Sequence, residues 1–382
     1  MNIIVVARGV ENIGIFEKDQ AKALQGLGHN VTILAVDLRS IRRKRHFGLH
    51  IENICEGVKS YTYSIPIGRM PSKLHDVIGS YVFKKLYKRY LKDFSKPDIV
   101  HAHFYNCGAF ATDLCKAENL PLVITEHSSN LNVKSILPSL KKRIIGIYSK
   151  ADKIIAVSES LQHNIKKLVG FDSEVVYNIA EIGDSNNTDI LFSQINSGFK
   201  FVAAGNLIFL KGFDVLVKAF SKVTAIYPFV NMTIYGDGPL KNNLQSLVND
   251  LGIENNVNFY GKYQKEDLKQ LWCDANAFVL ASRGETFGVV YIEAMLLGLP
   301  VIATRCGGPE NFVYDKVGYI VDKDNVDQLA DSMVKMIENR EDFNNDDIRR
   351  YALNNFSPNK IANKLTHVFE KILDNRTANK IK

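Results

Sequence analysis

The sequence predicts an α/β protein made of two doubly wound, Rossmann-like domains. Short apolar runs typical of buried strands alternate with amphipathic helical patterns along most of the chain. The alternation stops once, in the polar stretch 184–198, and then starts again. The length of 382 residues is enough for two or three domains, each with its own core. We therefore expect a first domain over 1–183, a linker over 184–198 and a second domain over 199–356, with the carboxyl ends of both sheets facing a cleft.

The first half begins with a buried strand over 2–7, which is too short for the apolar core of a signal peptide. Gly28 ends the helix after that strand, and Ser158 is a suitable cap for a later one. The remaining strands are expected at 30–36, 98–102, 122–125, 153–157 and 175–177, and the helices at 16–27, 73–94, 108–118, 135–150 and 158–169.

The second half repeats this alternation after the linker. An apolar stripe of Ile361, Leu365, Val368 and Ile372 predicts a final helix over 357–373. The other strands are expected at 200–204, 231–235, 257–260, 277–280, 301–303 and 319–321. One helix is expected to begin at 213 and a second to end at 251, and further helices are expected over 265–273, 289–297 and 326–337.

The composition is that of a soluble globular protein, with 46% hydrophobic and 23% charged residues. No apolar run approaches the ~20 residues that a membrane-spanning helix needs. The five cysteines are odd in number and include no C-x-x-C pair, which favours reduced thiols in a cytoplasmic protein and argues against a zinc site.

The net charge of +7 is unevenly distributed. Residues 1–180 hold 26 Lys and Arg against 16 Asp and Glu, which gives +10, and the remainder of the chain is acidic. Three basic clusters, at 39–45, 84–92 and 141–143, contribute most of this excess. Each is either ordinary solvated surface or part of a contact with an anionic membrane face. No nucleic-acid-binding motif accompanies them, so no nucleic acid partner is expected.

The most informative stretch runs from Glu285 to Glu293, two carboxylates with seven residues between them. Residues 289–297 are typical of a helix that Gly298 ends. Glu285 is therefore expected in the loop before the helix, and Glu293 about two turns inside it, on nearly the same side.

The start of that helix would meet a bound anion with free backbone N–H groups. A polyhydroxylated ligand along the helix would then meet one carboxylate at each end. A nucleotide sugar, which carries a diphosphate between two sugars, has these features. The N–H groups expected there belong to Thr286, Phe287 and Gly288.

Motifs along the whole chain resemble those of the retaining nucleotide-sugar glycosyltransferases of family 4, which have the two-domain GT-B fold. They are N-I-G-I-F-E-K-D-Q-A, P-D-I-V-H-A-H, I-T-E-H, A-D-K-I-I-A-V-S, A-A-G-N-L-I-F-L-K-G, I-Y-G-D-G-P, V-N-F-Y-G, E-T-F-G-V-V-Y-I-E and G-G-P-E. The resemblance implies that a sugar passes from a UDP- or GDP-linked donor to a glycan or lipid-linked acceptor, without a resident cofactor or metal. It also implies that the helix over 357–373 crosses back to the first domain.

Three catalytic residues are carried over from the resemblance. Lys211 resembles the family's phosphate-binding lysine, beside helix N-termini where a diphosphate leaving group can be held. Glu285 matches the carboxylate that faces the transferred sugar, and His127 matches a histidine near that sugar. Glu285 is expected to position the donor and not to act as a nucleophile of the kind found in retaining hydrolases.

The donor-binding residues are carried over in the same way. Glu293 matches the residue that binds the donor ribose, and Tyr263 is a candidate for the nucleobase pocket. The family usually has an arginine where this chain has Asn206, and the substitute is left open between Arg283, Arg305 and Arg8. Glycines that let the backbone approach the nucleotide are expected at Gly14, Gly236 and Gly238.

Several residues and interpretations remain open. His101 and His103 also lie at a strand end, and Asn178 matches half of a family Asn-Gly pair. Asp322 and Asp324 are expected to form a turn and a helix cap, and not a metal site. A nicotinamide-dependent oxidoreductase would need a G-x-G-x-x-G after the first strand, which this chain lacks. A non-catalytic nucleotide-sugar-binding protein is the other alternative, and it is motivated by Asn206.

The expected setting is surface polysaccharide or lipopolysaccharide assembly in the cytoplasm. Peripheral attachment to the cytoplasmic membrane face is left open beside it.

Overall fold

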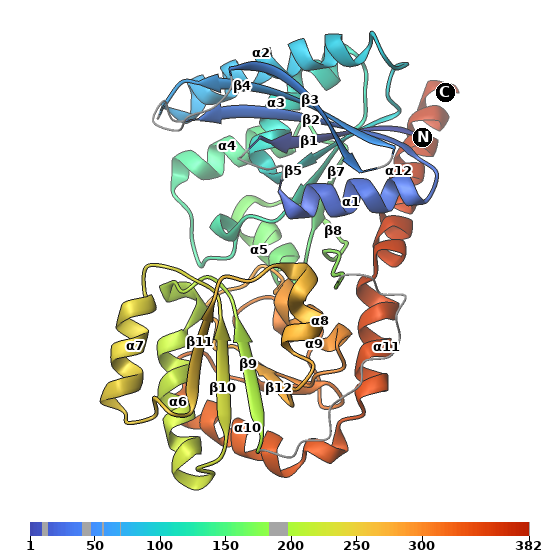
Figure 1. Cartoon of the computed structure of the whole chain (residues 1–382). Coiled ribbons are helices and arrows are strands. Elements are labelled where there is room, and N and C mark those ends of the chain that lie inside the picture. The colour runs from blue at the N-terminus through green and yellow to red at the C-terminus, as the bar shows by residue number, and fades with distance from the viewer. Residues whose placement is uncertain (10–13, 40–46, 56, 69, 183–197, 382) are drawn as a thin grey trace. The chain divides into compact units, whose positions relative to one another are not determined.

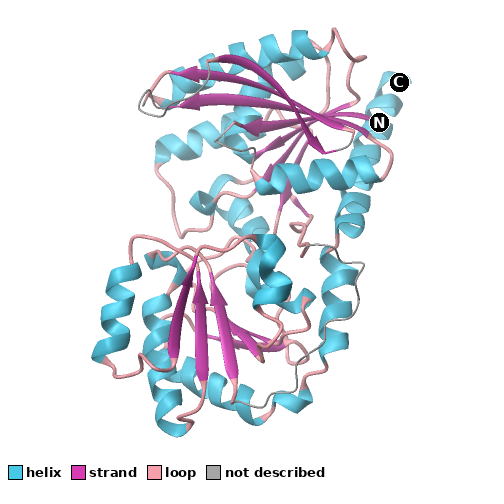
Figure 2. Cartoon of the chain, in the orientation of Figure 1, coloured by secondary structure: helices cyan, strands magenta, loops and turns pink. Residues whose placement is uncertain are grey.

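The computed structural model describes residues 1–9, 14–39, 47–55, 57–68, 70–182 and 198–381. The chain forms two compact units. Unit 1 comprises residues 1–179 and 358–382, and unit 2 comprises residues 180–357. Each has a largely parallel sheet covered by helices, which confirms the predicted α/β fold class (Figures 1 and 2). Most of the linker expected over 184–198 lies outside the described residues.

The sheet of unit 1 has the strand order β3-β4-β2-β1-β5-β6-β7-β8, and only β3 runs antiparallel to its neighbour. Its strands are β1 (Asn2–Arg8), β2 (Asn30–Arg39), β3 (Gly48–Cys55), β4 (Val58–Pro66), β5 (Ile99–His103), β6 (Leu122–Glu126), β7 (Lys153–Ala156) and β8 (Glu174–Val175). Its helices are α1 (Ile15–Gly26), α2 (Ser72–Tyr90), α3 (Phe104–Ala117), α4 (Pro138–Tyr148), α5 (Glu159–Val169) and α12 (Pro358–Ile381), with a 3₁₀ turn η1 (Ser129–Leu131).

The first strand occupies the centre of this core. Its apolar run is buried on both faces, as a parallel strand between two layers of helices must be. Ile3 and Val5 contact the layer formed by α1 and α12, where Leu365 and Phe369 are fully buried. The two helices come from opposite ends of the chain and lie side by side, blue and red in Figure 1. The C-terminal helix is therefore part of the core of unit 1.

The sheet of unit 2 is entirely parallel and has the order β11-β10-β9-β12-β13-β14. Its strands are β9 (Lys200–Ala204), β10 (Asn231–Tyr235), β11 (Val257–Gly261), β12 (Ala277–Val279), β13 (Val301–Thr304) and β14 (Gly318–Val321). Its helices are α6 (Phe213–Ile226), α7 (Lys241–Asp250), α8 (Leu268–Leu271), α9 (Val289–Leu296), α10 (Val326–Glu338) and α11 (Asn345–Phe356), with 3₁₀ turns η2 (Phe209–Lys211), η3 (Lys265–Asp267), η4 (Pro309–Asn311) and η5 (Arg340–Asp342).

Some elements differ from the sequence predictions. The β3–β4 hairpin was not predicted, because Leu49 and Ile51 of β3 are 40% and 47% exposed and give the strand no buried alternation. The helix expected over 265–273 is a 3₁₀ turn followed by the four-residue α8. The strand expected over 175–177 is reduced to Glu174–Val175.

Candidate functional site

In unit 2 the chain changes direction across its sheet between β9 and β12. Successive strands are added on one side of β9 as far as β11, and on its other side from β12 onwards. Doubly wound sheets bind ligands outside the carboxyl ends of the strands at such a switch point. The loop after β9 carries Lys211 and the loop after β12 carries Glu285, so the sheet order alone brings these two loops together.

Lys211 and Glu285 form a direct ion pair at this position. The Lys211 ammonium lies 2.6 Å from Oε1 of Glu285, and the buried Ser282 hydroxyl donates to the same oxygen at 2.8 Å. The two charged side chains are 20% and 10% exposed. A cation and a carboxylate are thus held beside each other at a partly accessible point, where each can contact a polar ligand.

The glycine after Lys211 explains how its loop comes so close to the neighbouring strand. Gly212 has φ +64°, and a Cβ atom there would lie 1.9 Å from the carbonyl oxygen of Ala281. Any side chain at this position would therefore push the Lys211 turn away from the end of β12. The Lys211–Glu285 contact therefore requires a glycine directly after Lys211.

Glu293 lies inside α9 and is largely buried. Its carboxylate is 3.6 Å from the ammonium of Lys265. Burial chiefly, and the negative charge of Glu293 secondarily, raise the pKa of Tyr263. Tyr263 also packs edge-on against Tyr235, with ring centroids 5.9 Å apart. Glu293 and the candidate nucleobase residue Tyr263 therefore belong to one local cluster.

The residues that open α9 are placed less simply than the sequence suggested. Gly288 has φ +98° and precedes the first helical residue, as expected for a sharp turn into the helix. The Phe287 ring is 1% exposed and packs on Phe312, so any role of Phe287 in ligand binding falls to its backbone. Gly308 covers that backbone closely, because a Cβ on it would lie 2.2 Å from the Phe287 carbonyl oxygen. Thr286 lies beside Glu285, half-buried.

The predicted glycines Gly236 and Gly238 lie where the loops after β9 and β10 press together. A Cβ on Gly236 would approach the carbonyl oxygen of Gly205 to 1.9 Å, and one on Gly238 would approach that of Leu207 to 2.6 Å. Asn206 is exposed in the same loop. The two glycines thus have a packing requirement of their own in addition to the predicted contact with a nucleotide.

The three arginines considered as substitutes at position 206 differ in their surroundings. Arg283 is 11% exposed, and its guanidinium is held by Asp214 and Asp324. Arg305 is 60% exposed and lies 3.4 Å from Asp322. Arg8 is exposed at the end of β1 in unit 1. Asp322 and Asp324 therefore pair with arginines, and Asp324 has the left-handed backbone of a turn (φ +61°).

Unit 1 has its own switch point, between β1 and β5. Gly14 caps α1 after β1, and a Cβ there would clash with the Glu17 carboxylate at 2.2 Å. His103 ends β5, and His127 comes directly after β6, the next strand. The Nδ1 atom of His103 lies 3.0 Å from Nε2 of His127. Two predicted positions and one of the open histidines are therefore near the same edge of the sheet.

These histidines are buried and neutral. The His127 ring is 6% exposed and stacks on Phe16 at 5.0 Å. Burial lowers the pKa of His101 and that of His127 to about 3, and lowers that of His103 well below its usual value. The nearby Asn178 side chain partly opposes the shift in the pKa of His127. The side chain of His127 therefore acts as an uncharged hydrogen-bonding group at neutral pH.

Sequence reasoning missed Glu126, the fully buried last residue of β6. One of its oxygens accepts hydrogen bonds from the backbone N–H groups of His127 and Ser128, and the other accepts from Tyr105 N–H and the Tyr148 hydroxyl. These contacts fix the loop that carries His127 to the start of α3. The available signal was a carboxylate ending an apolar strand in I-T-E-H, because such a residue needs internal donors.

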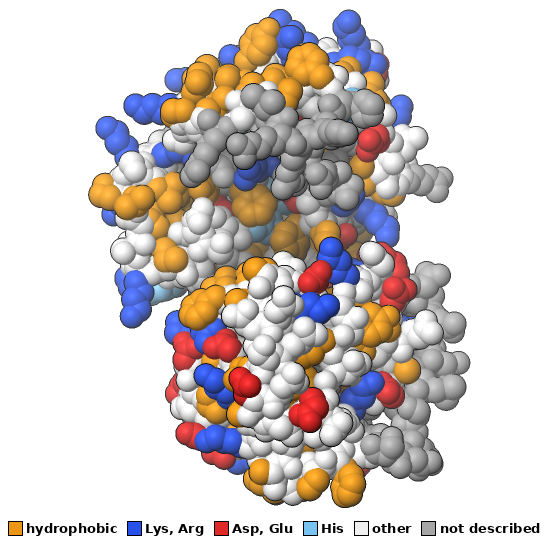
Figure 3. All heavy atoms as spheres, turned by 60° about the vertical axis from the view of Figure 1, so that its left-hand side comes forward, with side chains coloured by type: hydrophobic (Ala, Val, Ile, Leu, Met, Phe, Trp, Pro, Cys, Tyr) orange, Lys and Arg blue, Asp and Glu red, His pale blue; other side chains and the backbone are white. Residues whose placement is uncertain are grey.

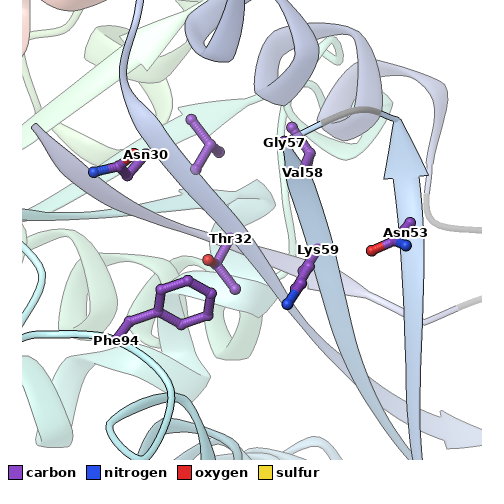
Figure 4. Close-up of a pocket in the computed structure, with 8 residues that line it drawn as sticks. Asn30, Thr32, Asn53, Gly57, Val58, Lys59 and Phe94 are labelled. Carbon is purple, nitrogen blue, oxygen red and sulfur yellow. The ribbon is translucent and has the colours of Figure 1, made fainter.

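A separate pocket of about 130 Å³ lies at the opposite edge of the unit 1 sheet, at the starts of β2 and β4 (Figure 4). The Lys59 ammonium there is 6.0 Å from the Phe94 ring centroid. The pocket contains none of the predicted site residues. Its lining is formed by Asn30, Val31, Thr32, Asn53, Gly57, Val58, Lys59 and Phe94.

Within the described part of the chain, no group of three or more His, Cys, Asp or Glu side chains is arranged to hold a metal ion. Among the helices described there, none combines the length and apolar character that crossing a membrane requires.

The fold and this site define a two-domain α/β protein whose second unit holds a polar switch point. Two family models match the chain, almost end to end. "Glycosyltransferase Family 4" covers residues 16–182 and "Glycosyl transferases group 1" covers residues 192–376. The chain belongs to the group 1, family 4 glycosyltransferases, which have the GT-B fold.

Individual relatives are distant. The chain is 27% identical over 289 residues to N-acetyl-alpha-D-glucosaminyl L-malate synthase of Bacillus anthracis, covering 72% of this chain and 75% of that protein. It is 26% identical to the putative teichuronic acid biosynthesis glycosyltransferase TuaC of Bacillus subtilis, covering 84% of each. The crystal structure of Anabaena HepE in complex with UDP shares the fold, with a TM-score of 0.73 and 18% identity over 97% of this chain and all of that one.

Proposed function

We propose that this glycosyltransferase transfers a sugar from a UDP- or GDP-linked donor to an acceptor hydroxyl, with retention of configuration at the anomeric carbon. The observation that carries the proposal is the Lys211–Glu285 ion pair at the switch point of unit 2. The pair supplies a cation and a carboxylate at a point where a diphosphate and a sugar would lie side by side. The family assignment favours neither of the alternatives, a non-catalytic binding protein or an oxidoreductase.

In this mechanism the bond between the anomeric carbon and the leaving phosphate oxygen breaks, and its electron pair stays on the phosphate. Lys211 stabilises the negative charge that develops there, together with the start of α6 behind it. The acceptor oxygen bonds to the anomeric carbon on the face that the phosphate leaves, and its proton passes to the leaving phosphate oxygen. The net change is that one glycosidic bond replaces one glycosyl phosphate bond.

The remaining site residues would bind and orient the donor. Glu285, fixed by Lys211 and Ser282, is placed to accept hydrogen bonds from the sugar hydroxyls. Glu293 would accept from the ribose hydroxyls, with Tyr263 near the base. Within unit 1, the role proposed for His127 is that of a neutral hydrogen-bonding group. No metal is required in this scheme, since Lys211 and helix N-termini hold the diphosphate.

The test begins with a thermal-shift panel of nucleoside diphosphates and nucleotide sugars, because a ligand that binds only the folded state raises its melting temperature. The donor so identified is then used with a glycan acceptor, and the anomeric configuration of the product is read by NMR. An inverted product would contradict retention. Complete loss of transfer in EDTA, restored by Mn²⁺ or Mg²⁺, would contradict metal independence. Donor binding with neither transfer nor donor hydrolysis would favour the binding-protein alternative.

The setting proposed is surface polysaccharide or lipopolysaccharide assembly on a glycan or lipid-linked acceptor. The assignment of TuaC to teichuronic acid biosynthesis supports such a setting. The surface of unit 1 supports a lipid-linked acceptor. In α2, Leu74, Val77 and Tyr81 are 48%, 66% and 59% exposed, and Lys84 and Lys88 continue the same helix face.

On the face drawn in Figure 3, Lys and Arg side chains are interspersed with hydrophobic ones over unit 1, while charges of both signs mix over unit 2. A face that combines apolar and basic side chains suits an anionic membrane surface. The basic cluster at 39–45 lies almost wholly outside the described residues. We therefore propose that the acceptor is met at the cytoplasmic membrane face, with α2 as the contact.

A further inference from the structure

Arg283 makes an unusually complete set of contacts in the loop after β12. Its guanidinium forms a two-pronged pair with Asp214, at 2.8 and 2.7 Å, and its Nε donates to Asp324 at 2.6 Å. The Phe209 ring lies 4.0 Å from the guanidinium carbon. Such planar, bidentate pairing is a property of arginine that lysine cannot reproduce. Arg283 is therefore committed to protein partners and is not placed as the missing diphosphate cation.

Apart from Asp324, the partners of Arg283 lie at the two ends of the turn that carries Lys211. Two of these contacts come before Lys211. The Nη1 of Arg283 donates to the carbonyl oxygen of Phe209 at 2.7 Å, and the backbone N–H of Arg283 donates to the carbonyl oxygen of Leu210 at 2.8 Å. After Lys211, Asp214 lies in the first turn of α6. Hydrogen bonds from Arg283 lower the pKa of Asp214, so this carboxylate stays charged.

We propose that Arg283 is a positioning residue, which fixes the turn holding Lys211 so that its ammonium meets the diphosphate of the donor. This inference rests on the proposed function, because it assigns a role within the same site. The residue acts through Lys211 and does not itself touch the donor. A lysine tail has four rotatable bonds, so the position of its ammonium depends on how firmly the turn is held.

The experiment compares Arg283→Met with Arg283→Lys in the full-length protein. Binding is measured by calorimetry with the nucleoside diphosphate that stabilises the wild-type protein most, and with the corresponding nucleoside. Loosening Lys211 should weaken diphosphate binding about tenfold in Arg283→Met, which corresponds to about 1.4 kcal/mol at 25 °C. Nucleoside binding should change little, because Glu293 and Tyr263 are untouched. Arg283→Lys should bind the diphosphate with intermediate affinity, since lysine keeps the positive charge but lacks the planar guanidinium that pairs with both oxygens of Asp214.

Arg340 provides the matched control. It is also a partly buried arginine of unit 2, with Nε donating to the carbonyl oxygen of Asn276 at 2.8 Å and Nη1 donating to that of Phe343 at 3.0 Å. The Asn276 contact lies directly before β12, at the opposite end of that strand from the loop that pairs with the Lys211 turn. Arg340→Met should lower stability as a structural arginine does, and should leave the ratio of diphosphate to nucleoside affinity unchanged.

The outcomes separate this inference from the function on which it rests. If the wild-type protein binds no nucleoside diphosphate, the proposed function fails. If it binds one and Arg283→Met keeps the wild-type affinity ratio, the positioning role is wrong and the function stands. If Arg283→Met does not fold, Asp214→Asn tests the same link by weakening one partner of the guanidinium, and an unchanged ratio there overturns the inference as well.

Discussion

At the switch point of unit 2, a lysine and a glutamate form an ion pair that stays partly exposed, whereas at that of unit 1 three histidines lie buried and uncharged. Both points lie at the carboxyl ends of parallel strands, so sheet topology alone does not distinguish them. The difference lies in the residues next to each strand end. The loops after β9 and β12 carry the charged Lys211 and Glu285, while aromatic rings cover the ends of β5 and β6.

The comparison indicates a division of work between the two units. In the proposed mechanism a developing negative charge needs a cation that is already oriented, and the Lys211 turn would supply one in unit 2. In unit 1 burial suppresses the charge of the three histidines, so they present no cation that would attract a phosphate. Variants in each unit test this contrast, and the largest effect is expected in unit 2.

Lys211→Met should have the largest effect. Losing a charged group aimed at a developing oxyanion costs about 10²- to 10³-fold in kcat, by analogy with removing one oxyanion-hole donor. The measurement is steady-state kinetics with the donor identified by thermal shift. Lys218→Met on the exposed face of α6 is the control and should retain activity. If Lys211→Met kept the wild-type kcat, Lys211 would have no role in the transfer step.

Glu293→Ala should weaken nucleotide binding while leaving the fold intact. Hydrogen bonds to charged groups contribute about 1.5–3 kcal/mol, so the dissociation constant should rise roughly 10- to 100-fold. Calorimetry gives the affinity and circular dichroism checks the fold. Unchanged donor affinity would place the ribose away from α9.

The buried histidines should make stability depend on pH. Their folded-state pKa values are lowered, so between about pH 6.5 and about 3 the unfolded chain binds more protons than the folded chain, and stability falls as the pH falls. Each such histidine contributes a slope of up to about 1.4 kcal/mol per pH unit within this window.

Replacing one histidine should reduce that slope. Between pH 6.5 and 5, the free energy of unfolding of His103→Asn should fall less than that of the wild-type protein, as measured by urea unfolding at each pH. The control is His163→Asn, which alters an exposed histidine of α5 and should keep the wild-type slope. Equal slopes in all three proteins would show that His103 is not held neutral.

The last contrast between the two units concerns the membrane surface. Each lysine near an anionic leaflet contributes about 1 kcal/mol, and the attraction acts over a Debye length of about 8 Å at physiological salt. Replacing Lys84, Lys85 and Lys88 with Glu should therefore reduce sedimentation with anionic vesicles at low salt. The matched control replaces three exposed lysines of unit 2, Lys316, Lys323 and Lys335, with Glu. Equal recovery of the wild-type protein with neutral and anionic vesicles would refute the membrane contact.

Much of the fold could be predicted from local patterns. The strand 2–7, the helix after Glu285 and the apolar stripe of the C-terminal helix were all legible, because burial on a fixed face imposes a period on the sequence. The β3–β4 hairpin was not, since the side chains of β3 are largely exposed and its pairing with β4 is made through backbone groups that carry no side-chain signal.

For the candidate site, the sequence by itself determined which residue types are present and on which loops they lie. Lys211 and Glu285 could each be named from their motifs, although they lie 74 positions apart in the chain. Only the tertiary structure decided that they are in contact, because strand order β10-β9-β12 places their loops side by side. It likewise decided that Arg283 holds the Lys211 turn, and that Glu126 fixes the His127 loop. Contacts of this kind depend on which strands are neighbours, and strand order is set by the packing of the whole sheet and not by any local stretch of sequence.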